Sequence, residues 1–424
     1  MSNIDSLCPD RIAELVATAP ASLEWQSPFY RKMHANPELS GQEEQTAGRI
    51  AAKLRDIDGQ ILTGIGGHSV IHVMRNPADD GTPGPVVLLR ADIDGLPVTE
   101  NTGSPFASVA TARNDQGELV GTMHACGHDM HTTAGLGATF MLDALRDKWA
   151  GTVVTLFQPA EETTSGAQAM LDDELAEKIP APDVCLAQHI VPGPAGQVMS
   201  MAGPALAGCD TITITLSGQS AHASMPHNAI DPTYLAAMIV VRLQGIVGRE
   251  VAPQEFAVVS VGTLQSGNSN NTIPQTAKLV LNCRYYSEAV RQQVTAAIER
   301  IARGEAIASG CLHEPTFEYS CRGEITDNSD AVFASVRPAF DAVFGDDSVD
   351  AQAWTASEDF SVIPRGLGAP YLYWTVGATP RELWATGKNI PSNHMDNFLP
   401  DEEPVMAATT KALAAAALAN LAAR

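Results

Sequence analysis

Side chains that bind divalent metals are concentrated in one short stretch of this 424-residue chain. Three histidines, one cysteine and one aspartate fall within eight consecutive positions: His124, Cys126, His128, Asp129 and His131. Thiolate, neutral imidazole and carboxylate are the ligands that borderline metals such as zinc prefer. The sequence therefore predicts a metal-dependent hydrolase whose other parts position a substrate over this cluster.

Cys126 and His128 are two residues apart, and in an irregular loop that spacing can aim both side chains at one point. A bound metal would keep the cysteine as a thiolate, which is able to bridge two ions. For an isolated pair we would favour a buried thiol beside a surface histidine. With further metal-binding side chains so close, that interpretation becomes the weaker one.

Two adjacent carboxylates, Glu161 and Glu162, follow an apolar run that ends at Phe157. Adjacent carboxylates usually mark a solvated helix start, but burying two unpaired charges after a strand would be costly. That difficulty is removed if one binds a metal and the other is the general base toward a water that the metal activates. The residues alone do not assign the two roles.

Two more histidines are weaker candidates on pattern alone. His189 closes another apolar run, where a lone histidine is more often structural, and His394 lies in an exposed-looking segment that spacing would not single out. For His34, a hydrogen-bonded structural role is favoured over that of a metal ligand. Ser40 followed by Glu43 has the pattern of a capping box before a helix.

Three polar residues of a later region are further candidates, although an ordinary loop or surface role is the first interpretation of each. His222 lies in a loop bounded by glycine and proline, Asn271 in a polar loop, and Arg284 near the end of an alternating strand, where it could be a solvated edge charge.

Composition narrows the class of protein and its partners. The chain is 45% apolar and 18% charged, which is typical of a globular protein, and its length favours two domains. The formal charge of −23 argues against nucleic acid, so an anionic substrate would need a local cationic pocket. We expect no signal peptide and no membrane span, and seven scattered cysteines suggest a cytoplasmic setting.

Strand and helix patterns place the candidates. Apolar runs at 86–94, 151–157 and 184–189 predict buried strands of an α/β, largely parallel sheet, which delivers functional residues at its carboxyl edge. From about residue 206 the order becomes β-α-β-β-α-β, the ferredoxin-like pattern. We therefore expect a discontinuous catalytic domain (1–205 and 321–424) with an inserted domain at 206–320. The alanine-rich stretch near 406–423 is interpreted as a final amphipathic helix.

Several segments together resemble one known family, over nearly the whole chain. The segments are 34–39, 90–97, 123–131, 157–162 and 357–360. They are similar to the signatures of the N-acyl-amino-acid amidohydrolases, the hippurate hydrolase and auxin-conjugate hydrolase branch of the aminoacylase and carboxypeptidase G superfamily. The resemblance implies two divalent ions per subunit, zinc or manganese, and an inserted lid domain that also dimerises.

The resemblance also implies roles for individual residues. The metal ligands would be Cys126, His128, Glu162, His189 and His394, with Cys126 bridging the ions. Glu161 would be the general base, and His222 would stabilise the oxyanion, in many relatives at the partner subunit's site. Asn271 and Arg284 would hold the substrate carboxylate.

The leading hypothesis is hydrolysis of an N-acyl amino acid, a small-molecule substrate, by a cytoplasmic homodimer or dimer-based oligomer. A dipeptidase, a carboxypeptidase or an N-carbamoyl-amino-acid hydrolase on the same scaffold is the alternative among enzymes. A non-catalytic metal- or ligand-binding module is less favoured, because pure binding has no use for a second glutamate beside the first.

Overall fold

The computed structural model describes residues 7–424, which divide into two compact units. The first unit takes in the chain up to Ala205 together with Asp327–Gln352 and Asp359–Arg424, and the second takes in Leu206–Thr326 and Ala353–Glu358. The second unit is therefore inserted into the first along the sequence, and each is described here by itself.

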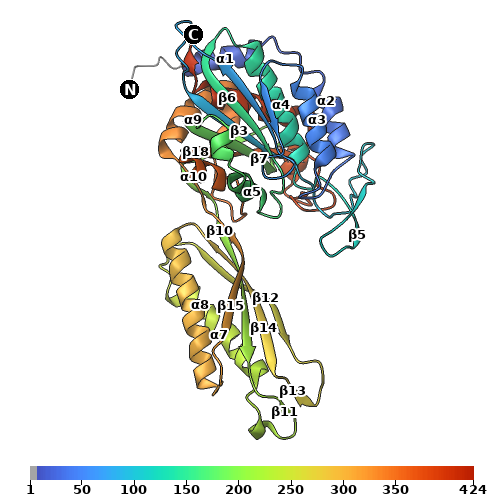
Figure 1. Cartoon of the computed structure of the whole chain (residues 1–424), viewed down its shortest axis with the longest axis vertical. Coiled ribbons are helices and arrows are strands. Elements are labelled where there is room, and N and C mark those ends of the chain that lie inside the picture. The colour runs from blue at the N-terminus through green and yellow to red at the C-terminus, as the bar shows by residue number, and fades with distance from the viewer. Residues whose placement is uncertain (1–6) are drawn as a thin grey trace. The chain divides into compact units, whose positions relative to one another are not determined.

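A nine-stranded mixed sheet forms the centre of the first unit (Figure 1). Its order is β1 (Gln60–Thr63), β2 (Val70–Asn76), β6 (Trp149–Gln158), β3 (Val86–Asp92), β7 (Val184–Pro194), β18 (Tyr371–Thr379), β8 (Val198–Ser200) and β17 (Ser348–Asp350), with β19 (Ala422–Ala423) on β6. The central strands β6, β3, β7 and β18 are parallel neighbours. The predicted largely parallel α/β sheet is confirmed, and the continuous apolar runs follow from burial on both faces.

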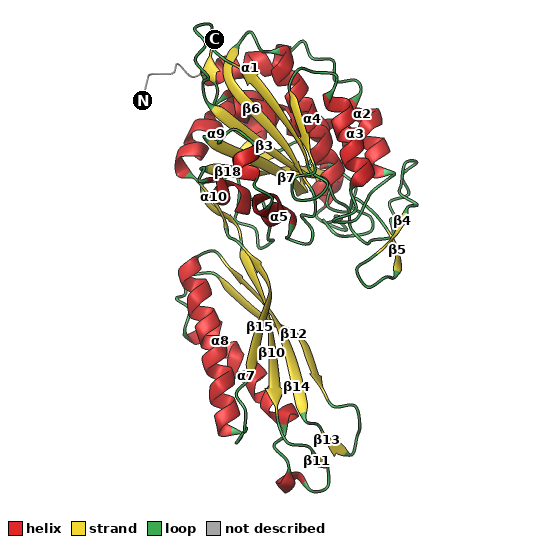
Figure 2. Ribbon diagram, viewed as in Figure 1, coloured by secondary structure: helices red, strands yellow, loops and turns green. Residues whose placement is uncertain are grey.

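Helices flank this sheet (Figure 2). The longer ones are α1 (Pro9–Thr18), α2 (Gln26–His34), α3 (Glu44–Leu54), α4 (His128–Ala144), α9 (Asp330–Phe344) and α12 (Glu402–Leu418). Shorter elements are α5 (Gly166–Asp172), α6 (Leu175–Lys178), α10 (Val362–Leu367), α11 (Arg381–Thr386), and the strands β4 (Thr111–Arg113), β5 (Leu119–Gly121), β9 (Gly203–Leu206) and β16 (Thr326–Asn328). None of the helices in the described part of the chain combines the length and apolarity needed to cross a bilayer.

Two local predictions were wrong. The alanine-rich helix α12 is buried over most of its surface instead of being amphipathic, because its small side chains let it pack closely against α4 and the rest of the core. The capping box does not form either. Helix α3 starts after Glu43 without a side-chain cap, and the Ser40 hydroxyl instead donates to Asp94 Oδ2 at 2.7 Å.

The second unit has the predicted β-α-β-β-α-β order. Its elements are β10 (Gly208–Ser217), α7 (Pro232–Arg249), β12 (Ala257–Ser266), β14 (Thr276–Tyr285), α8 (Glu288–Ala308) and β15 (Thr316–Gly323), with a small ribbon of β11 (Ala221–His222) and β13 (Thr272–Ile273). The sheet is antiparallel in the order β12-β14-β10-β15. Alternate apolar residues such as Ile212 and Leu281 pack with buried side chains of the two helices. The expected ferredoxin-like fold is confirmed.

Candidate metal centre

The ends of parallel strands and the start of one helix deliver the candidate ligands of the first unit. Strand β6 ends just before Glu161 and Glu162, β7 carries His189, and His128 opens α4. Gly127, the cap of α4, has φ 84°, and a Cβ there would lie 2.3 Å from Ile190 Cδ1. Only glycine fits that turn, which separates Cys126 from His128. The carboxyl edge of the sheet is thus the site, as expected for open α/β folds.

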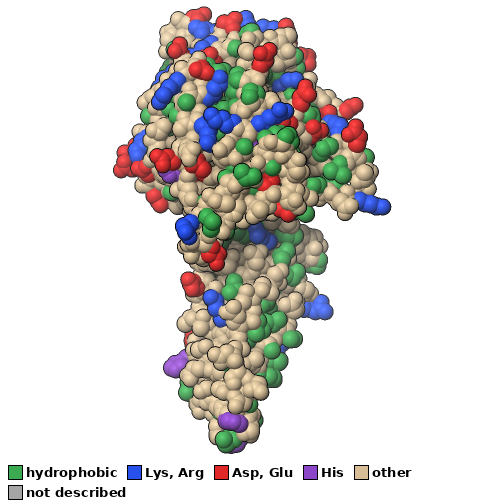
Figure 3. All heavy atoms as spheres, turned by 90° about the vertical axis from the view of Figure 1, so that its right-hand side faces the viewer, with side chains coloured by type: hydrophobic (Ala, Val, Ile, Leu, Met, Phe, Trp, Pro, Cys, Tyr) green, Lys and Arg blue, Asp and Glu red, His purple; other side chains and the backbone are tan. Residues whose placement is uncertain are grey.

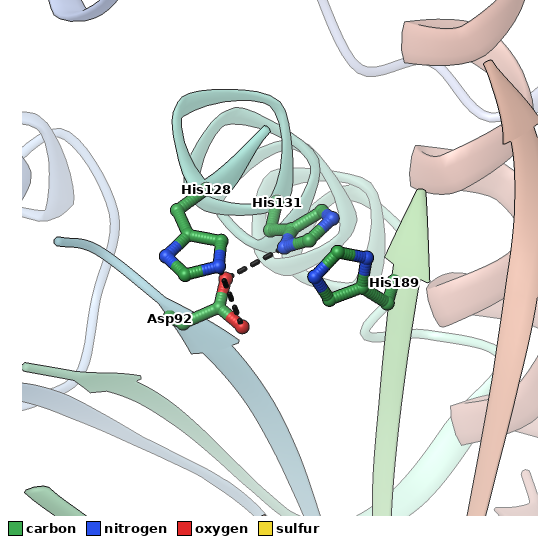
Figure 4. Close-up of side chains that lie close together, drawn as sticks. All are labelled: Asp92, His128, His131 and His189. Carbon is green, nitrogen blue, oxygen red and sulfur yellow. Dashed lines mark hydrogen bonds and ion pairs between the residues drawn. The ribbon is translucent and has the colours of Figure 1, made fainter. Parts of the chain in front are cut away.

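Several overlapping groups of potential ligands meet at this edge, each with its ligand atoms within 4.8 Å of one another, and two of them together contain the predicted ligands. One group is Asp92, His128, His131 and His189, drawn in Figure 4; the other is Cys126, Glu162 and His394. The Cys126 sulfur connects the groups, because it lies 3.4 Å from His189 Nε2 and 3.3 Å from His394 Nε2. The structure therefore brings all five sequence-predicted ligands together.

His128 is oriented so that one nitrogen is left for a ligand. Its Nδ1 lies 3.0 Å from Asp94 Oδ1, and since a carboxylate accepts, Nδ1 carries the proton. Its Nε2 is buried and has no hydrogen-bond partner among the residues that the structure describes. Carboxylate oxygens of Asp92, Glu161 and Glu162 lie 3.7 to 3.8 Å from Nε2. Burial opposes the charge, but the nearby carboxylates raise the pKa of His128 to about 10. A divalent cation at that point would take the place of the proton and balance these carboxylates.

Hydrogen-bond direction separates His189 from His131. His189 Nδ1 lies 2.7 Å from the carbonyl oxygen of Ile190, so Nδ1 donates and Nε2, near Cys126, keeps its lone pair. In His131, Nε2 accepts from the Ile190 N–H at 2.9 Å and Nδ1 donates to Asp92 Oδ1 at 2.6 Å. Both nitrogens of His131 are occupied, so it orients Asp92 and the strand β7 instead of binding a metal.

His34 and Asp129 form a buried pair away from the ligand atoms. His34 Nδ1 lies 2.6 Å from Asp129 Oδ2, and its Nε2 lies 3.1 Å from Glu100 Oε1. Burial opposes the charge, but the two carboxylates raise the pKa of His34 to about 10. The structural role expected for His34 agrees with this arrangement, and Asp129 holds that imidazolium in place of a metal.

Burial and neighbouring carboxylates oppose ionisation of two acidic groups in this pocket. Burial raises the pKa of the Cys126 thiol well above its usual value, and Glu162 and Glu161 add to the rise. Burial likewise raises the pKa of Glu162 to about 7, with Asp94 contributing. A buried thiol and carboxylates that resist ionisation alone are a donor set suited to divalent cations, which would reverse both shifts. The residues present therefore fit two metal ions.

The two glutamates differ in their neighbours. Glu162 Oε2 lies 3.3 Å from His394 Nε2, and the pair groups with Cys126. Both glutamates lie similarly far from His128 Nε2, at 3.8 Å for Glu161 and 3.7 Å for Glu162, and these three residues form a further potential group. Glu161 is not, however, in the group of Cys126 and His394. Ala160, directly before them, has φ 51°, a strained conformation that sets the direction of the pair. The geometry favours Glu162 as ligand and leaves Glu161 beside the centre.

Sequence reasoning missed three residues that position the ligands. The carboxylate of Asp94 accepts from His128, from Ser40 and, at 3.0 Å, from the backbone N–H of Glu162. Asn393 Nδ2 donates to the Ile190 carbonyl oxygen at 3.0 Å and so fixes the segment before His394. The acidic end of the run at 86–94 was a usable signal for Asp94, whereas the local pattern marked Ser40 only as a helix cap and did not mark Asn393.

The second unit does not bring its three candidates to one point. Arg284 lies near one end of β14, half-buried on an interior strand, and it donates to Asn282 Oδ1 at 3.0 Å and to Ser357 Oγ. The interpretation of Arg284 as a solvated charge at the edge of the sheet is therefore wrong. His222 and Asn271 lie together beyond the other end of β14, at the β11–β13 ribbon. Eight residues of strand span about 26 Å, so the two ends are far apart.

His222 is exposed and set up to donate. Its Nδ1 accepts from the Ser224 N–H at 3.2 Å, so in the neutral ring the proton is on Nε2. Asn271 Oδ1 accepts from the Ser269 hydroxyl at 2.7 Å, which leaves the amide NH₂ group as the part that can face a ligand. Both side chains can therefore offer hydrogen-bond donors to an anionic or carbonyl oxygen.

Comparison with known proteins identifies a matching family and several relatives of the chain. A profile of peptidase family M20/M25/M40 matches residues 88–419. The chain is 33% identical over 386 residues to an N-acetylcysteine deacetylase of Bacillus subtilis, covering 89% of this chain and 92% of that protein. It is also 33% identical to a hippurate hydrolase of Campylobacter jejuni, over 80% of this chain and 86% of that one.

Among solved structures, the Bacillus subtilis YXEP protein, described as a dinuclear metal binding peptidase from the M20 family, superposes with a TM-score of 0.76. That match has 28% identity and covers 94% of this chain and 99% of that one. The expected resemblance and the expected class of enzyme, an amide-cleaving hydrolase, are confirmed, and the chain belongs to peptidase family M20/M25/M40.

Proposed function

We propose that this enzyme hydrolyses the amide bond of N-acyl amino acids and releases a carboxylic acid and an amino acid. The observation that carries the proposal is the meeting of Cys126, His128, Glu162, His189 and His394 at one sheet edge with Glu161 beside them. The deacetylase and hippurate hydrolase activities named for its relatives support the same substrate class.

The five ligands would hold two divalent ions, zinc or manganese. When bound, such ions supply Lewis acidity that polarises a carbonyl and makes water more acidic. Glu161 would take the proton from the attacking water and return it to the departing nitrogen. Because Glu161 is 6% exposed, it works in a poorly hydrated environment, where proton transfer is not diverted to bulk water.

Residues of the second unit would bind the substrate. Arg284 offers the local positive charge that an acidic protein needs for a carboxylate substrate, by a paired contact of its planar guanidinium. The Nε2–H of His222 would donate to the carbonyl oxygen as negative charge develops there. Asn271 would donate its amide to the substrate carboxylate.

The separation of these residues bears on assembly. A substrate holds its carboxylate and its scissile carbonyl only a few bonds apart, whereas Arg284 and His222 lie at opposite ends of β14. One copy of the second unit cannot place both on the same molecule, so His222 would act on the site of a partner chain. Edge strand β12 and exposed side chains of its neighbourhood, Tyr234, Val241, Val247 and Leu264, would form the dimer contact, and Figure 3 shows hydrophobic side chains gathered along one side of this unit.

The test is a product assay on metal-stripped protein reloaded with zinc or manganese. N-acetyl and N-benzoyl amino acids should release free amino acid faster than dipeptides or N-carbamoyl amino acids do. Glu161→Gln should lower turnover by about 100- to 10,000-fold with both metals retained by elemental analysis. A preference for dipeptides would refute the substrate class, and normal turnover by the glutamine variant would refute the base.

A further inference from the structure

Two cysteines of the second unit lie against each other on the sheet face opposite the helices. Cys209 on β10 and Cys321 on β15 bring their sulfurs to 3.5 Å, across neighbouring antiparallel strands. The register shifts beside this position, and such a bulge turns a side chain toward its neighbour. The other face of β10 carries Ile212 and Ile214 toward the helices. The two cysteines therefore lie on the face of the sheet that α7 and α8 do not cover.

The space around the Cys209 sulfur depends on a glycine in the neighbouring strand. A Cβ at Gly323 would lie 2.7 Å from the Cys209 sulfur, so only glycine leaves it room. Cys209 is 4% exposed, while Cys321 is partly accessible at the strand edge. The hydrogen bond from Cys321 lowers the pKa of Cys209, and Ser357 and Arg284 add to the effect despite burial. Two sulfurs in contact, one of them with a lowered pKa, are the arrangement of a reactive dithiol.

We propose that Cys209 and Cys321 form a reversible disulfide, a redox-sensitive modification site beside Arg284. Rotation about the two Cα–Cβ bonds moves the sulfurs, which must close from 3.5 Å to a bond of about 2.05 Å. In the register of β10 and β15, Cys209 is opposite Gly323 and Cys321 is opposite Thr211, so the two cysteines are diagonal neighbours whose sulfurs already touch.

Hydrogen peroxide is an oxidant whose small size and reactivity with thiolates suit this site. The Cys209 thiolate attacks one peroxide oxygen, the O–O bond breaks, and the departing hydroxide takes a proton to become water, leaving a sulfenic acid. The Cys321 sulfur then attacks the Cys209 sulfur, the S–O bond breaks, and the hydroxide leaves with the Cys321 proton as a second water. The two thiols lose two electrons and the peroxide gains them.

The bond would also change the surroundings of Arg284. In the reduced protein Cys209 is paired with Arg284 in the register of β10 and β14, and both share Ser357 as a hydrogen-bonding neighbour. Oxidation removes a thiol that can ionise beside the guanidinium, so Arg284 attracts an external carboxylate more strongly. This consequence rests on the substrate role proposed for Arg284, whereas formation of the disulfide does not.

The test exposes the metal-loaded enzyme to hydrogen peroxide, blocks remaining thiols with N-ethylmaleimide and maps peptides by mass spectrometry. Wild type and the matched control Cys311→Ser should both give a peptide joining Cys209 to Cys321, which a phosphine reductant cleaves. Cys209→Ser and Cys321→Ser should not. Recovery of both cysteines as separate maleimide adducts or separate sulfinic acids would overturn the proposal.

Kinetics on the same samples test the link to Arg284. The oxidised wild type should show a KM for an acyl amino acid lower by at least about twofold, reversed on reduction, with no such change in Cys321→Ser. An unchanged KM in protein that carries the disulfide would overturn the link. If no acyl amino acid is turned over, the proposed function fails while the peptide map still decides the disulfide.

Discussion

The substitution Asp94→Asn tests how the centre selects the metal-binding form of His128. Asp94 Oδ2 accepts from the Ser40 hydroxyl and from the Glu162 backbone N–H, while Oδ1 faces His128 Nδ1. The Glu162 N–H can only donate, so the amide oxygen of an asparagine must stay on that side. Its NH₂ group then faces His128 Nδ1 and forces the proton to Nε2, the nitrogen that is needed for a metal.

The expected cost follows from that change of tautomer. Loss of a partner that orients a ligating histidine lowers metal affinity by about 10- to 100-fold, or about 1.4 to 2.7 kcal/mol. Affinity is measured by competition with a coloured chelator at neutral pH, after circular dichroism has shown that the variant is folded. Ser40→Ala is the matched control, because it removes a hydrogen bond to the same carboxylate but leaves the tautomer of His128 unchanged. If Asp94→Asn binds metal as tightly as the serine variant does, the tautomer argument is refuted.

Three further outcomes are expected. Mixing His222→Ala with Glu161→Gln subunits should restore activity to about a quarter of wild type after random reassembly, because one site of each mixed dimer has both residues; no recovery would mean that His222 serves its own chain. Arg284→Ala should raise KM for an acyl amino acid by at least about tenfold but leave KM for its methyl ester nearly unchanged, and equal effects on both would remove the carboxylate contact. His72 is buried, and burial followed by the charge of Arg146 lowers its pKa to about 4 from 6.5, so the unfolded chain takes up its proton first as pH falls. Relative to His72→Leu, the wild type should therefore lose about 3 kcal/mol of unfolding free energy between pH 6.5 and pH 4, measured by denaturant unfolding at each pH. The same change of unfolding free energy with pH in both proteins would contradict this.

The fold was predictable because its signals are continuous along the chain. Strands β3, β6 and β7 are buried on both faces and therefore appear as unbroken apolar runs that end in polar residues. The period-two alternation of β10 marks the change to a sheet with only one covered face. By contrast, Ser40 matches a capping pattern but bonds to Asp94, a residue 54 positions away. Local sequence contains no signal for such a contact, because a distant partner competes for the same hydroxyl.

The candidate ligands illustrate the same limit. Cys126 and His128 stand out by their spacing, whereas His394 reaches the Cys126 sulfur from 268 positions away and was found only through family resemblance. Its backbone has φ 69° and its N–H bonds to the Ala125 carbonyl oxygen at 2.8 Å. A turn conformation that depends on a tertiary hydrogen bond cannot be inferred from the residues around it.

Residue type alone does not decide which histidine can bind a metal. His128, His131 and His189 are all buried within one cluster, with ring centroids 4.5 to 5.8 Å apart. The distinction lies in what faces each nitrogen. A carboxylate or carbonyl oxygen at Nδ1 of His128 and His189 fixes the proton there and leaves Nε2 as a lone pair, whereas the Ile190 N–H facing His131 Nε2 uses up that lone pair. Ile190 thus supplies its carbonyl to one histidine and its N–H to another, so the backbone of a single residue of β7 leaves His189 Nε2 available to a metal and commits His131 to the support of Asp92.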